Sequence, residues 1–563
     1  MIVDRFWLKQ YPPGVDAEVD INAYASIREI LESSCRRFGE LPAYSNMGVS
    51  IRYRELDEMS REFGAYLQQV AGLRKGDRIA LMLPNLLQYP VALFGALRAG
   101  LVVVNVNPQY TPRELEYQLK DSGATVIVVL ENFAHTLEQV IDRVPIKTVI
   151  TTQVGDLFPP VKALLTNVVV KHVKKMVPSW RLPGSVPFRT ALRHGREQTF
   201  QNLPLGHDDI AFLQYTGGTT GVAKGTVLTH GNLVSNMQQL AAWISLDLDE
   251  GSECAILPLP LYHIYALIAN LVFMKIGAHV VLITNPRDLP DFLKTLRHHR
   301  PTAMIGVNTL YNALLNAPGF ETVDLSKLKL ACAGGMAVQR AVAERWKKAT
   351  GTPLVEGYGL TETSPVVTSN KLSIEDWTGT IGLPLPSTEV IVIDDDGVEL
   401  PRGERGELAV RGPQVMRGYW NRPDETAKVF TEDGWLRTGD IGYLDEQGYC
   451  RITDRKKDII VVSGFKVFPN EIEDVVAMHP GVLEVAAVGV PDQASGEAVK
   501  IFVVKKDPSL TEAGIIAHCR ESLTGYKIPK LVEFRSEPLP KSNIGKILRR
   551  LLREPVPAAQ ATS

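Results

Sequence analysis

The sequence predicts an α/β protein with a large N-terminal domain of α/β subdomains plus a small β-rich subdomain, followed by a small α+β C-terminal domain. Three patterns support this prediction. Apolar segments of strand and helix length alternate over residues 78–130, residues 379–419 are rich in strand-forming side chains, and short helix and strand patterns mix after about residue 458. Alternating strands and helices are typical of a parallel sheet with helices on its faces.

Clear start signals bound the first alternation. Thr111-Pro112-Arg113-Glu114 combines a capping box with proline at the first helical position, so a helix should begin at Pro112. In chain order we expect a strand at Ile79–Leu83, a helix at Gln88–Arg98, a strand at Leu101–Val104, a helix at Pro112–Lys120 and a strand at Thr125–Leu130.

The last third of the chain predicts shorter elements. We expect antiparallel strands at Val390–Ile393 and Glu407–Val410, then a helix at Asn470–Met478, strands at Val485–Val490 and Ile501–Val504, and a helix at Thr511–Leu523. This change of pattern places the domain boundary near residues 456–458. The two predicted domains therefore span residues 1–456 and 457–563.

Two segments raise the question of a membrane. Residues 254–274 carry no formal charge, but two prolines, a histidine and an asparagine favour a strand, a loop and a buried helix over a transmembrane span. Residues 161–177 predict an amphipathic helix, and the charges in and after it are Lys162, Lys171, Lys174, Lys175 and Arg181. Packing on the domain with a solvated face is the favoured interpretation, and docking on anionic lipid is the alternative.

The composition excludes some classes of protein. The 563 residues include 61 Lys and Arg against 63 Asp and Glu, a formal net charge of −2. The protein therefore has no overall positive electrostatic field that would attract nucleic acid, and a nucleic-acid-binding protein is not expected. Five widely spaced cysteines without a CxxC pair suggest neither a disulfide framework nor a zinc site. The N-terminus lacks the apolar core of a signal peptide, so we expect a cytoplasmic protein.

The run from Tyr215 to Gly225, YTGGTTGVAKG, is the sharpest chemical signal. Glycines let backbone N–H groups crowd around a phosphate, hydroxyls add donors or metal ligands, and Lys224 supplies charge. The run is not a Walker A loop, because no Gly-Lys-Ser/Thr follows a glycine at the required spacing. A phosphate-binding loop explains the composition better than a surface turn does.

Two further clusters suggest the rest of a nucleotide site. The run from Glu356 to Thr363, EGYGLTET, adds the Glu362 carboxylate, a hard oxygen ligand that suits Mg²⁺. Asp440 follows a Thr-Gly pair, and its carboxylate can accept from two ribose hydroxyls. The charged run Arg455–Asp458 lies at the predicted domain boundary, where it fits a hinge.

Taken in order, these segments resemble the ANL superfamily of adenylate-forming enzymes, and within it the bacterial long-chain fatty acid–CoA ligases. The resemblance runs from Leu83-Pro84-Asn85 through the loops above to Asn543-Ile544-Gly545-Lys546. It implies a mobile C-terminal domain and two half-reactions. A carboxylate first displaces pyrophosphate from ATP, and the thiol of CoA then displaces AMP from the acyl-adenylate. Positioning and electrostatic stabilisation should dominate such catalysis.

The resemblance also implies roles for single residues. Lys546 would be the catalytic lysine, Thr216 and Glu362 would act in catalysis by holding Mg²⁺, and Lys457 would be the hinge. The thioester-forming step with CoA would involve Ser463, Gly464, Phe465 and Lys466. The ATP-binding residues would be Thr216, Gly217, Gly218, Thr219, Thr220, Gly221, Lys224, Gly334, Gly335, Gly357, Tyr358, Gly359, Thr361, Asp440 and Arg455.

The fatty acid is expected to bind near His263, Ile264, Leu267 and Gly335. Amino-acid-activating relatives have an aspartate where this chain has Ile264, so a free amino acid is not expected. The uncharged segment 254–274 suits an apolar tunnel, in which each buried CH₂ contributes about 0.8 kcal/mol. Leu267 stands where some long-chain relatives have a tryptophan gate, which leaves the gating and the preferred chain length open.

Several alternatives stay open at this point. They are a ligase for medium-chain or other acids, transfer of the acyl group to a carrier protein in trans, and a fatty-acid or nucleotide sensor without turnover. An acyltransferase is disfavoured, because His298-His299 is followed at the fourth position by Ala303 and not by aspartate. The resemblance also suggests β-oxidation, peripheral contact with the inner membrane and a homodimer.

Overall fold

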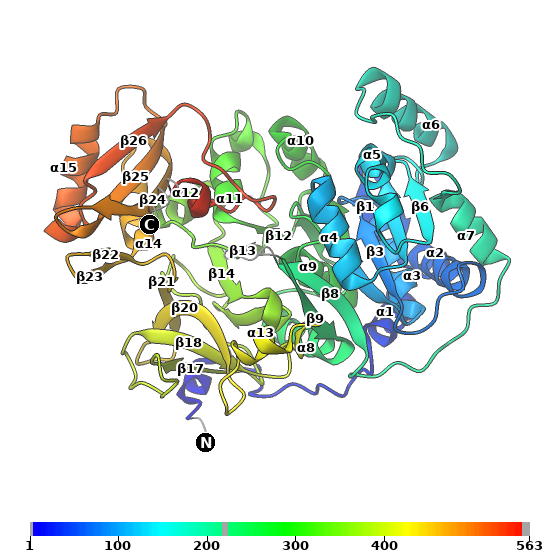
Figure 1. The fold of residues 1–563 in the computed structure, drawn as a ribbon, viewed down its shortest axis with the longest axis horizontal. Helices are drawn as coiled ribbons and strands as arrows, with labels where there is room; N and C mark the ends of the chain where they lie inside the picture. The colour runs from blue at the N-terminus through cyan, green and yellow to red at the C-terminus, as the bar shows by residue number, and fades with distance from the viewer. Residues whose placement is uncertain (1–3, 217–222, 554–563) are drawn as a thin grey trace, which may run out of the picture.

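The computed structural model describes residues 4–216 and 223–553, and in these residues the strands form four sheets. Two large sheets contribute strands to one extensive apolar core, and five helices contribute to the same core: α1 (Ile27–Phe38), α2 (Tyr53–Ala65), α3 (Gln88–Arg98), α8 (His230–Ile244) and α9 (Ile264–Lys275). The two smaller sheets lie together at one end of the longest axis (Figure 1). The mixed α/β class and the small C-terminal unit are as predicted.

The first large sheet contains the predicted alternation. Its order is β19-β9-β8-β4-β3-β5-β6-β7, and β3, β4, β5 and β6 run parallel. The strands are β3 Arg78–Met82, β4 Val102–Asn105, β5 Val126–Leu130, β6 Thr148–Thr152, β7 Val186–Pro187, β8 Ile210–Thr216, β9 Lys224–Thr229 and β19 Gly418–Tyr419. Helix α3 spans Gln88–Arg98 as expected, and the Thr111 hydroxyl caps α4, Pro112–Ser122, by accepting from the Glu114 amide.

The second large sheet has the order β16-β15-β14-β13-β12-β10-β11-β1-β2. The strands are β1 Pro42–Asn46, β2 Val49–Arg52, β10 Cys254–Leu257, β11 His279–Leu282, β12 Ala303–Gly306, β13 Leu330–Ala333, β14 Leu354–Gly359, β15 Val366–Ser369 and β16 Leu383–Pro384. The segment 254–274 forms strand β10, a loop and the buried helix α9, Ile264–Lys275, as predicted. No helix within 4–216 or 223–553 has the length and apolar character needed to cross a membrane.

The other helices fill the connections. They are α1 Ile27–Phe38, α2 Tyr53–Ala65, α5 Ala134–Glu138, α6 Pro160–Val168, α7 Phe188–Arg196, α8 His230–Ile244, α10 Leu289–His299, α11 Asn308–Leu315, α12 Arg340–Thr350, α13 Pro423–Ala427, α14 Pro469–Ala477 and α15 Glu512–Ser522. Helices α14 and α15 pack on the last sheet, so the C-terminal unit has its own core.

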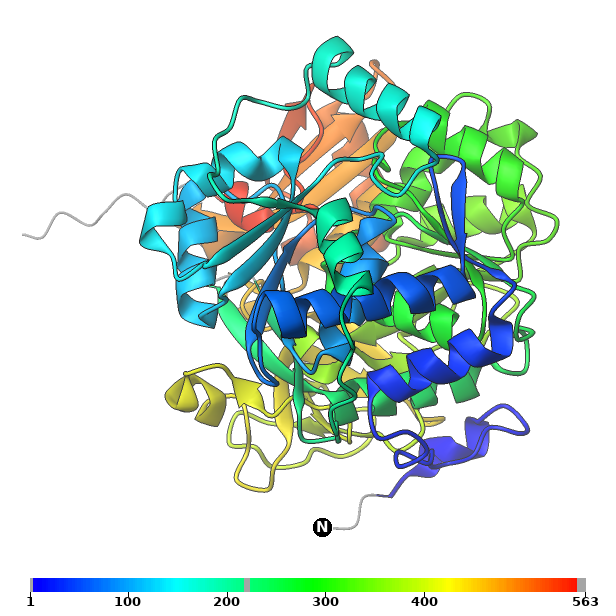
Figure 2. The ribbon, with the colours of Figure 1, turned by 90° about the vertical axis from the view of Figure 1, so that its right-hand side faces the viewer.

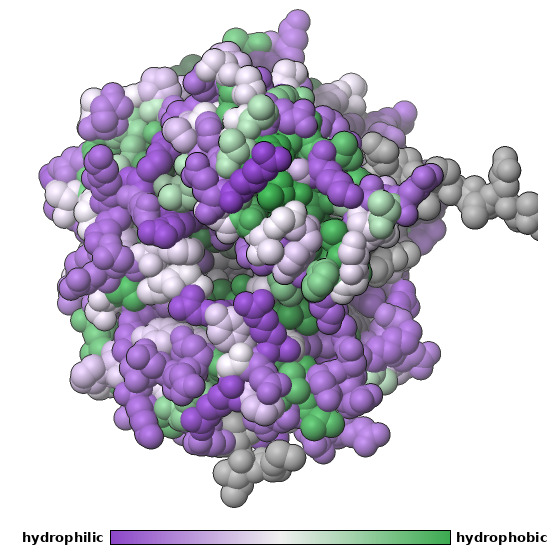
Figure 3. Space-filling model, turned by 90° about the vertical axis from the view of Figure 1, so that its left-hand side faces the viewer, coloured by the Kyte–Doolittle hydropathy of each residue, from purple (hydrophilic) through white to green (hydrophobic). Residues whose placement is uncertain are grey.

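The two small sheets meet at the predicted domain boundary. The four-stranded sheet consists of β17 Glu389–Ile393, β18 Gly406–Arg411, β20 Leu436–Leu444 and β21 Cys450–Arg455. The C-terminal sheet consists of β22 Ile460–Val462, β23 Phe465–Val467, β24 Val482–Asp492, β25 Gly496–Lys505 and β26 Leu531–Arg535. The predicted boundary at 456–457 falls in the connection between β21 and β22. The outer surface of the molecule at this end is mostly hydrophilic, with separate apolar patches (Figure 3).

Helix α6 differs from the favoured interpretation of its segment. It continues into a π-helical turn at Val169–Val173, and only Ala163 of α6 is buried. The apolar side chains that were expected to pack on the domain are exposed, at Val161, Leu164, Leu165, Val168, Val169, Val173 and Met176. The reason is position, because the helix stands at the outer edge of the molecule, where no other element within residues 4–216 and 223–553 covers its apolar side (Figures 1 and 2).

Candidate active site

One cavity of about 940 Å³ brings most of the predicted site residues together. The predicted residues that line it are Thr216, Lys224, His263, Ile264, Gly334, Gly335, Gly357, Tyr358, Gly359, Thr361, Glu362, Arg455 and Lys546. Thr216 and Lys224 face each other as a register pair of the β8–β9 hairpin. Between them, the predicted Gly217, Gly218, Thr219, Thr220 and Gly221 lie outside the described residues.

Asp440 lies behind the wall of the cavity and holds two residues that line it. The Tyr358 hydroxyl donates to Asp440 Oδ2 at 2.7 Å, and Arg455 Nε lies 3.1 Å from Asp440 Oδ1. Asp440 and Arg455 are register partners on β20 and β21, so the sheet itself fixes their contact. Burial and the adjacent Asp440 carboxylate raise the pKa of Tyr358 far above its ordinary value, so the phenol remains a donor.

Glu362 lies at another part of the cavity wall. The Tyr419 hydroxyl donates to Glu362 Oε1 at 2.7 Å, and this bond orients the carboxylate. Thr216, which carries a hydroxyl, lines the same cavity. A carboxylate and a hydroxyl are hard oxygen donors, the type that Mg²⁺ prefers, so the residues present fit this ion.

Sequence reasoning missed several residues at this wall. Tyr419 and Glu425 line the cavity because β19 pairs with β9, which joins residues almost two hundred positions apart. Lys224 Nζ forms an ion pair with Glu425 at 2.5 Å, and this bond is the main cause that lowers the pKa of Glu425 to about 2. Neither Tyr419 nor Glu425 belongs to a recognisable motif, so no sequence signal pointed to them, and only the pairing of β19 with β9 brings them to the cavity.

The loop that carries Lys546 is docked on the large N-terminal part. The Thr309 hydroxyl, on α11, donates to the Gly545 carbonyl at 2.9 Å. Gly545 has a φ of +85°, and an added Cβ would meet Thr309 Oγ1 at 2.8 Å, so only glycine fits there. Burial, and then the Arg455 charge, lowers the pKa of Lys546 to about 8. Burial, followed by the Lys546 charge, lowers that of His263 to about 4.

The cavity extends from this polar region between helices α8 and α9. The additional lining residues there are Leu240, Trp243, Ile244, Ile268, Ala269, Val272 and Phe273. On α9 the lining positions recur three or four residues apart, as one helical face requires. Leu267 lies off this face and is fully buried in the core, so the structure does not place it at the cavity, and Ile268 lines the wall instead.

The residues expected to serve CoA lie elsewhere. Ser463, Gly464, Phe465 and Lys466 form the turn and start of the β22–β23 hairpin and do not line the cavity. The Phe465 side chain is 56% exposed and stacks on Tyr526 with ring centroids 4.8 Å apart. Lys457 lies between the two small sheets, and burial lowers its pKa.

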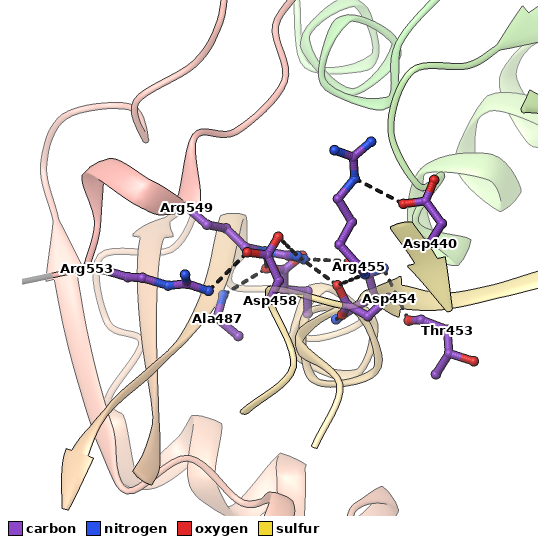
Figure 4. Close-up of polar contacts among 10 residues, drawn as sticks. Asp440, Thr453, Asp454, Arg455, Asp458, Ala487, Arg549 and Arg553 are labelled. Atoms are coloured by element: carbon purple, nitrogen blue, oxygen red, sulfur yellow. Dashed lines mark hydrogen bonds and ion pairs between the residues drawn. The ribbon is translucent and has the colours of Figure 1, made fainter. Parts of the chain in front are cut away.

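A network around Arg549 joins the two sides of this connection (Figure 4). Arg549 Nη1 lies 3.2 Å from Asp454 Oδ1 on β21, and Arg549 Nη2 lies 2.7 Å from Glu473 Oε2 on α14. Asp458 takes part through contacts with Arg549 at 3.6 Å and Arg553 at 3.0 Å. The C-terminal tail therefore holds both neighbouring elements at once.

The combination of fold and cavity defines an AMP-binding enzyme, and the chain belongs to that family. The family model for the AMP-binding enzyme matches residues 31–420, and the model for its C-terminal domain matches residues 471–546. These matches confirm the expected membership in the adenylate-forming ANL superfamily.

Individual relatives are similar over almost the full length. A long-chain-fatty-acid–CoA ligase of Escherichia coli O6:H1 is 57% identical over 551 residues, covering 98% of both chains. A protein of the same name from Bacillus subtilis is 39% identical, covering 97% of both. The crystal structure of the anthranilate CoA ligase AuaEII with anthranoyl-AMP has a TM-score of 0.83 at 26% identity, covering 94% of this chain and 96% of the other.

Proposed function

We propose that this protein is an AMP-forming, long-chain fatty acid–CoA ligase. The single observation that carries the proposal is the form of the cavity, in which a polar region with Lys546, Glu362 and Arg455 continues into an apolar arm between α8 and α9. A carboxylate can meet ATP in the first part while its hydrocarbon chain lies in the second. The relatives that bear the name of this activity support the proposal.

In the adenylation step, a carboxylate oxygen of the fatty acid attacks the α-phosphorus of ATP, and the bond to pyrophosphate breaks. The Lys546 ammonium would lie against both reacting anions and stabilise the negative charge that they share. The Tyr358–Asp440–Arg455 wall would hold the nucleoside, with Asp440 toward the ribose. Lys224 and the adjoining loop would hold the outgoing phosphates, which requires Lys224 to exchange its partner Glu425 for them.

Mg²⁺ would be held by Glu362 and Thr216, and it would supply neutralising charge at the phosphate oxygens. The chain's own contribution there is orientation, because the Tyr419 hydroxyl donates to the Glu362 carboxylate.

In the second step, the CoA sulfur attacks the acyl carbon, and AMP leaves with the electrons of the broken C–O bond. The docked loop of Lys546 would have to withdraw to give the thiol access. We propose that residues 457–563 rotate as a unit about Lys457 and bring the hairpin at Ser463–Lys466 to the cavity. The separate core of this unit is the structural support for its moving as a body.

A product assay tests the function. The purified protein is incubated with ATP, Mg²⁺, CoA and free fatty acids of several lengths, and the products are identified by mass. Acyl-CoA and AMP in equal amounts are expected, with long chains preferred. Turnover only with medium-chain or aryl acids would refute the long-chain proposal. Turnover only with a carrier protein's pantetheine thiol would refute CoA as the acceptor. Ligand binding without ATP consumption would indicate a sensor.

We also propose that the enzyme contacts the surface of an anionic membrane through α6 and the turn that follows it. The exposed apolar side chains, among them Val161 at 74% and Val173 at 71%, supply a surface that can insert at the lipid boundary. Lys162, Lys174 and Lys175 add positive charge on the same segment. Such contact would let the protein take its water-insoluble substrate from the bilayer, with β-oxidation as the expected use of the product. The homodimer stays a prediction.

A further inference from the structure

A cluster of three metal-ligating side chains lies apart from the active-site cavity. Cys254, His279 and His299 each offer a ligand atom, and these atoms all lie within 4.8 Å of one another. None of the three residues lines the cavity. Among residues 4–216 and 223–553, no other group of three His, Cys, Asp or Glu ligand atoms comes together in this way.

The fold explains why these residues meet. Cys254 and His279 are the first residues of the parallel strands β10 and β11, and they are register partners, so their side chains project from the same face of the sheet. Two positions further, Ile256 and Val281 face the apolar residues Phe292, Leu293 and Leu296 of α10. His299 continues that face of α10 by one turn. At the edge of an apolar layer, the chain therefore places a thiol and two imidazoles where more apolar side chains would complete the packing.

The hydrogen bonds around these three residues resemble those around the ligands of a metal site. Ser45 Oγ, on the neighbouring strand β1, lies 2.6 Å from His279 Nε2 and fixes that ring, as an outer hydrogen bond does for most metal-binding histidines. The Thr302 hydroxyl accepts from the Cys254 amide at 2.9 Å and fixes the backbone of the thiol residue. The ring centroids of His279 and His299 are 5.5 Å apart, with the ring planes at 69°, and all three residues are half-buried, which leaves access from solvent.

We propose that Cys254, His279 and His299 form a binding site for Zn²⁺ or a similar thiophilic cation, with water as the remaining ligand. One sulfur and two imidazole nitrogens are a ligand set that favours zinc over magnesium or calcium, which prefer oxygen. Because the three ligands come from β10, β11 and α10, a bound ion clamps the end of α10 to the sheet. Sequence spacing gave no sign of this site, because 25 and 20 residues separate the ligands. The strand register aligns Cys254 with His279, and the packing of α10 on the sheet adds His299.

The test measures metal on the whole protein. Metal-free protein is dialysed against Zn²⁺, and bound metal is counted by mass spectrometry, with Co²⁺ used separately as an absorbing probe of thiolate coordination. We expect one site-bound Zn²⁺, a rise in Tm with Zn²⁺, and a thiolate-to-cobalt charge-transfer band. Cys254→Ser should abolish the band, and His299→Asn should weaken Zn²⁺ binding at least tenfold.

Matched controls are Cys519→Ser, a buried cysteine of the C-terminal core, and His172→Asn, an exposed histidine. Both should retain the wild-type metal content and the cobalt band. The proposal is overturned if the wild type binds no more Zn²⁺ than a Cys254→Ser/His299→Asn double variant, or if Cys254→Ser keeps the band. Circular dichroism of each variant shows that it is folded, so a loss of metal reports on the ligands.

Discussion

Arg549 and Asp454 form a buried ion pair across the connection that we propose to be a hinge. Asp454 is 1% exposed in its side chain and belongs to β21, before Lys457, whereas Arg549 belongs to the C-terminal tail. The partner Glu473 lies on the same side of the hinge as Arg549. A rotation about Lys457 would therefore separate Arg549 from Asp454 and leave the pair with Glu473 intact.

This relationship predicts that Asp454 favours the orientation in which Lys546 reaches the cavity. Asp454→Asn should slow acyl-adenylate formation at least tenfold, because the loss of one partner of a buried ion pair costs about 3–5 kcal/mol. Thioester formation from supplied acyl-adenylate and CoA should keep its rate. Asp395→Asn, which removes an exposed ion pair to Lys456 at the same connection, is the control and should change neither rate. Equal losses in both half-reactions would contradict the interpretation.

Lys546→Ala should lower the rate of adenylation by a factor of a thousand or more and leave the rate of the second half-reaction unchanged. The ammonium must be charged to stabilise the reacting anions, and burial lowers its pKa to about 8. The wild-type adenylation rate should therefore be level below pH 8 and fall above it as the proton is lost. Lys506→Ala, an exposed lysine of the same unit, should keep both rate and profile. Single-turnover measurements of pyrophosphate release across pH 6–10 check this, and a rate that stays level to pH 10 would exclude the role.

Ala269 lies on the face of α9 that lines the apolar arm, so a larger side chain there should shorten the space for the acyl chain. Ala269→Phe should lower kcat/KM for a sixteen-carbon acid at least tenfold and leave that for an eight-carbon acid within about threefold. The physical reason is that each CH₂ excluded from the arm forfeits about 0.8 kcal/mol. Leu267→Met is a volume-conserving change on the core side of the same helix. It should leave the ratio of kcat/KM for the sixteen-carbon acid to kcat/KM for the eight-carbon acid unchanged. If Ala269→Phe leaves this ratio of kcat/KM values unaltered, the acyl chain binds elsewhere.

Helix α6 should carry the contact with lipid. Leu164→Asp/Leu165→Asp should reduce co-flotation with vesicles that contain anionic phosphatidylglycerol, because both side chains are exposed and neither contributes to the core. The substitution Leu246→Asp, at another exposed leucine, is the matched control. Replacing Lys171, Lys174 and Lys175 together should weaken flotation at low salt. Unchanged flotation in both sets of variants would refute docking through this helix.

Glu356 predicts a pH dependence of stability. The residue is 8% exposed, and burial raises the pKa of its carboxyl from 4.5 to about 8, with the nearby Asp474 charge acting in the same direction. Between these values the folded state keeps a proton that the unfolded state loses, so the free energy of unfolding falls as pH rises, by up to about 1.4 kcal/mol per pH unit.

In the variant Glu356→Gln, the amide side chain does not titrate. The free energy of unfolding of this variant, relative to that of the wild type, should therefore rise steadily from pH 5 to pH 8. Urea unfolding at several pH values measures the difference. The exposed Glu375→Gln should run parallel to the wild type, and a parallel course for Glu356→Gln would contradict the prediction.

The α/β class, the order of the first strands and helices, and thirteen of the residues that line the cavity could be predicted from the sequence alone. Local signals suffice for these features. The capping box at Thr111 fixes the start of α4, and the glycine, hydroxyl and carboxylate groups of EGYGLTET single out a segment that lines the cavity. Motifs that bind a ligand are short and contiguous, so they are visible before the chain is folded.

Which distant residues meet depends on the folded chain and could not be predicted. Strand pairing brings Tyr419 to Glu362 and aligns Cys254 with His279, and helical phase turns Ile268 and Ala269, but not Leu267, toward the cavity. The exposure of α6 was equally hidden, because an apolar helical stripe looks the same whether or not another element covers it. Sequence records the chemistry of each side chain, whereas register and packing across the fold determine its neighbours.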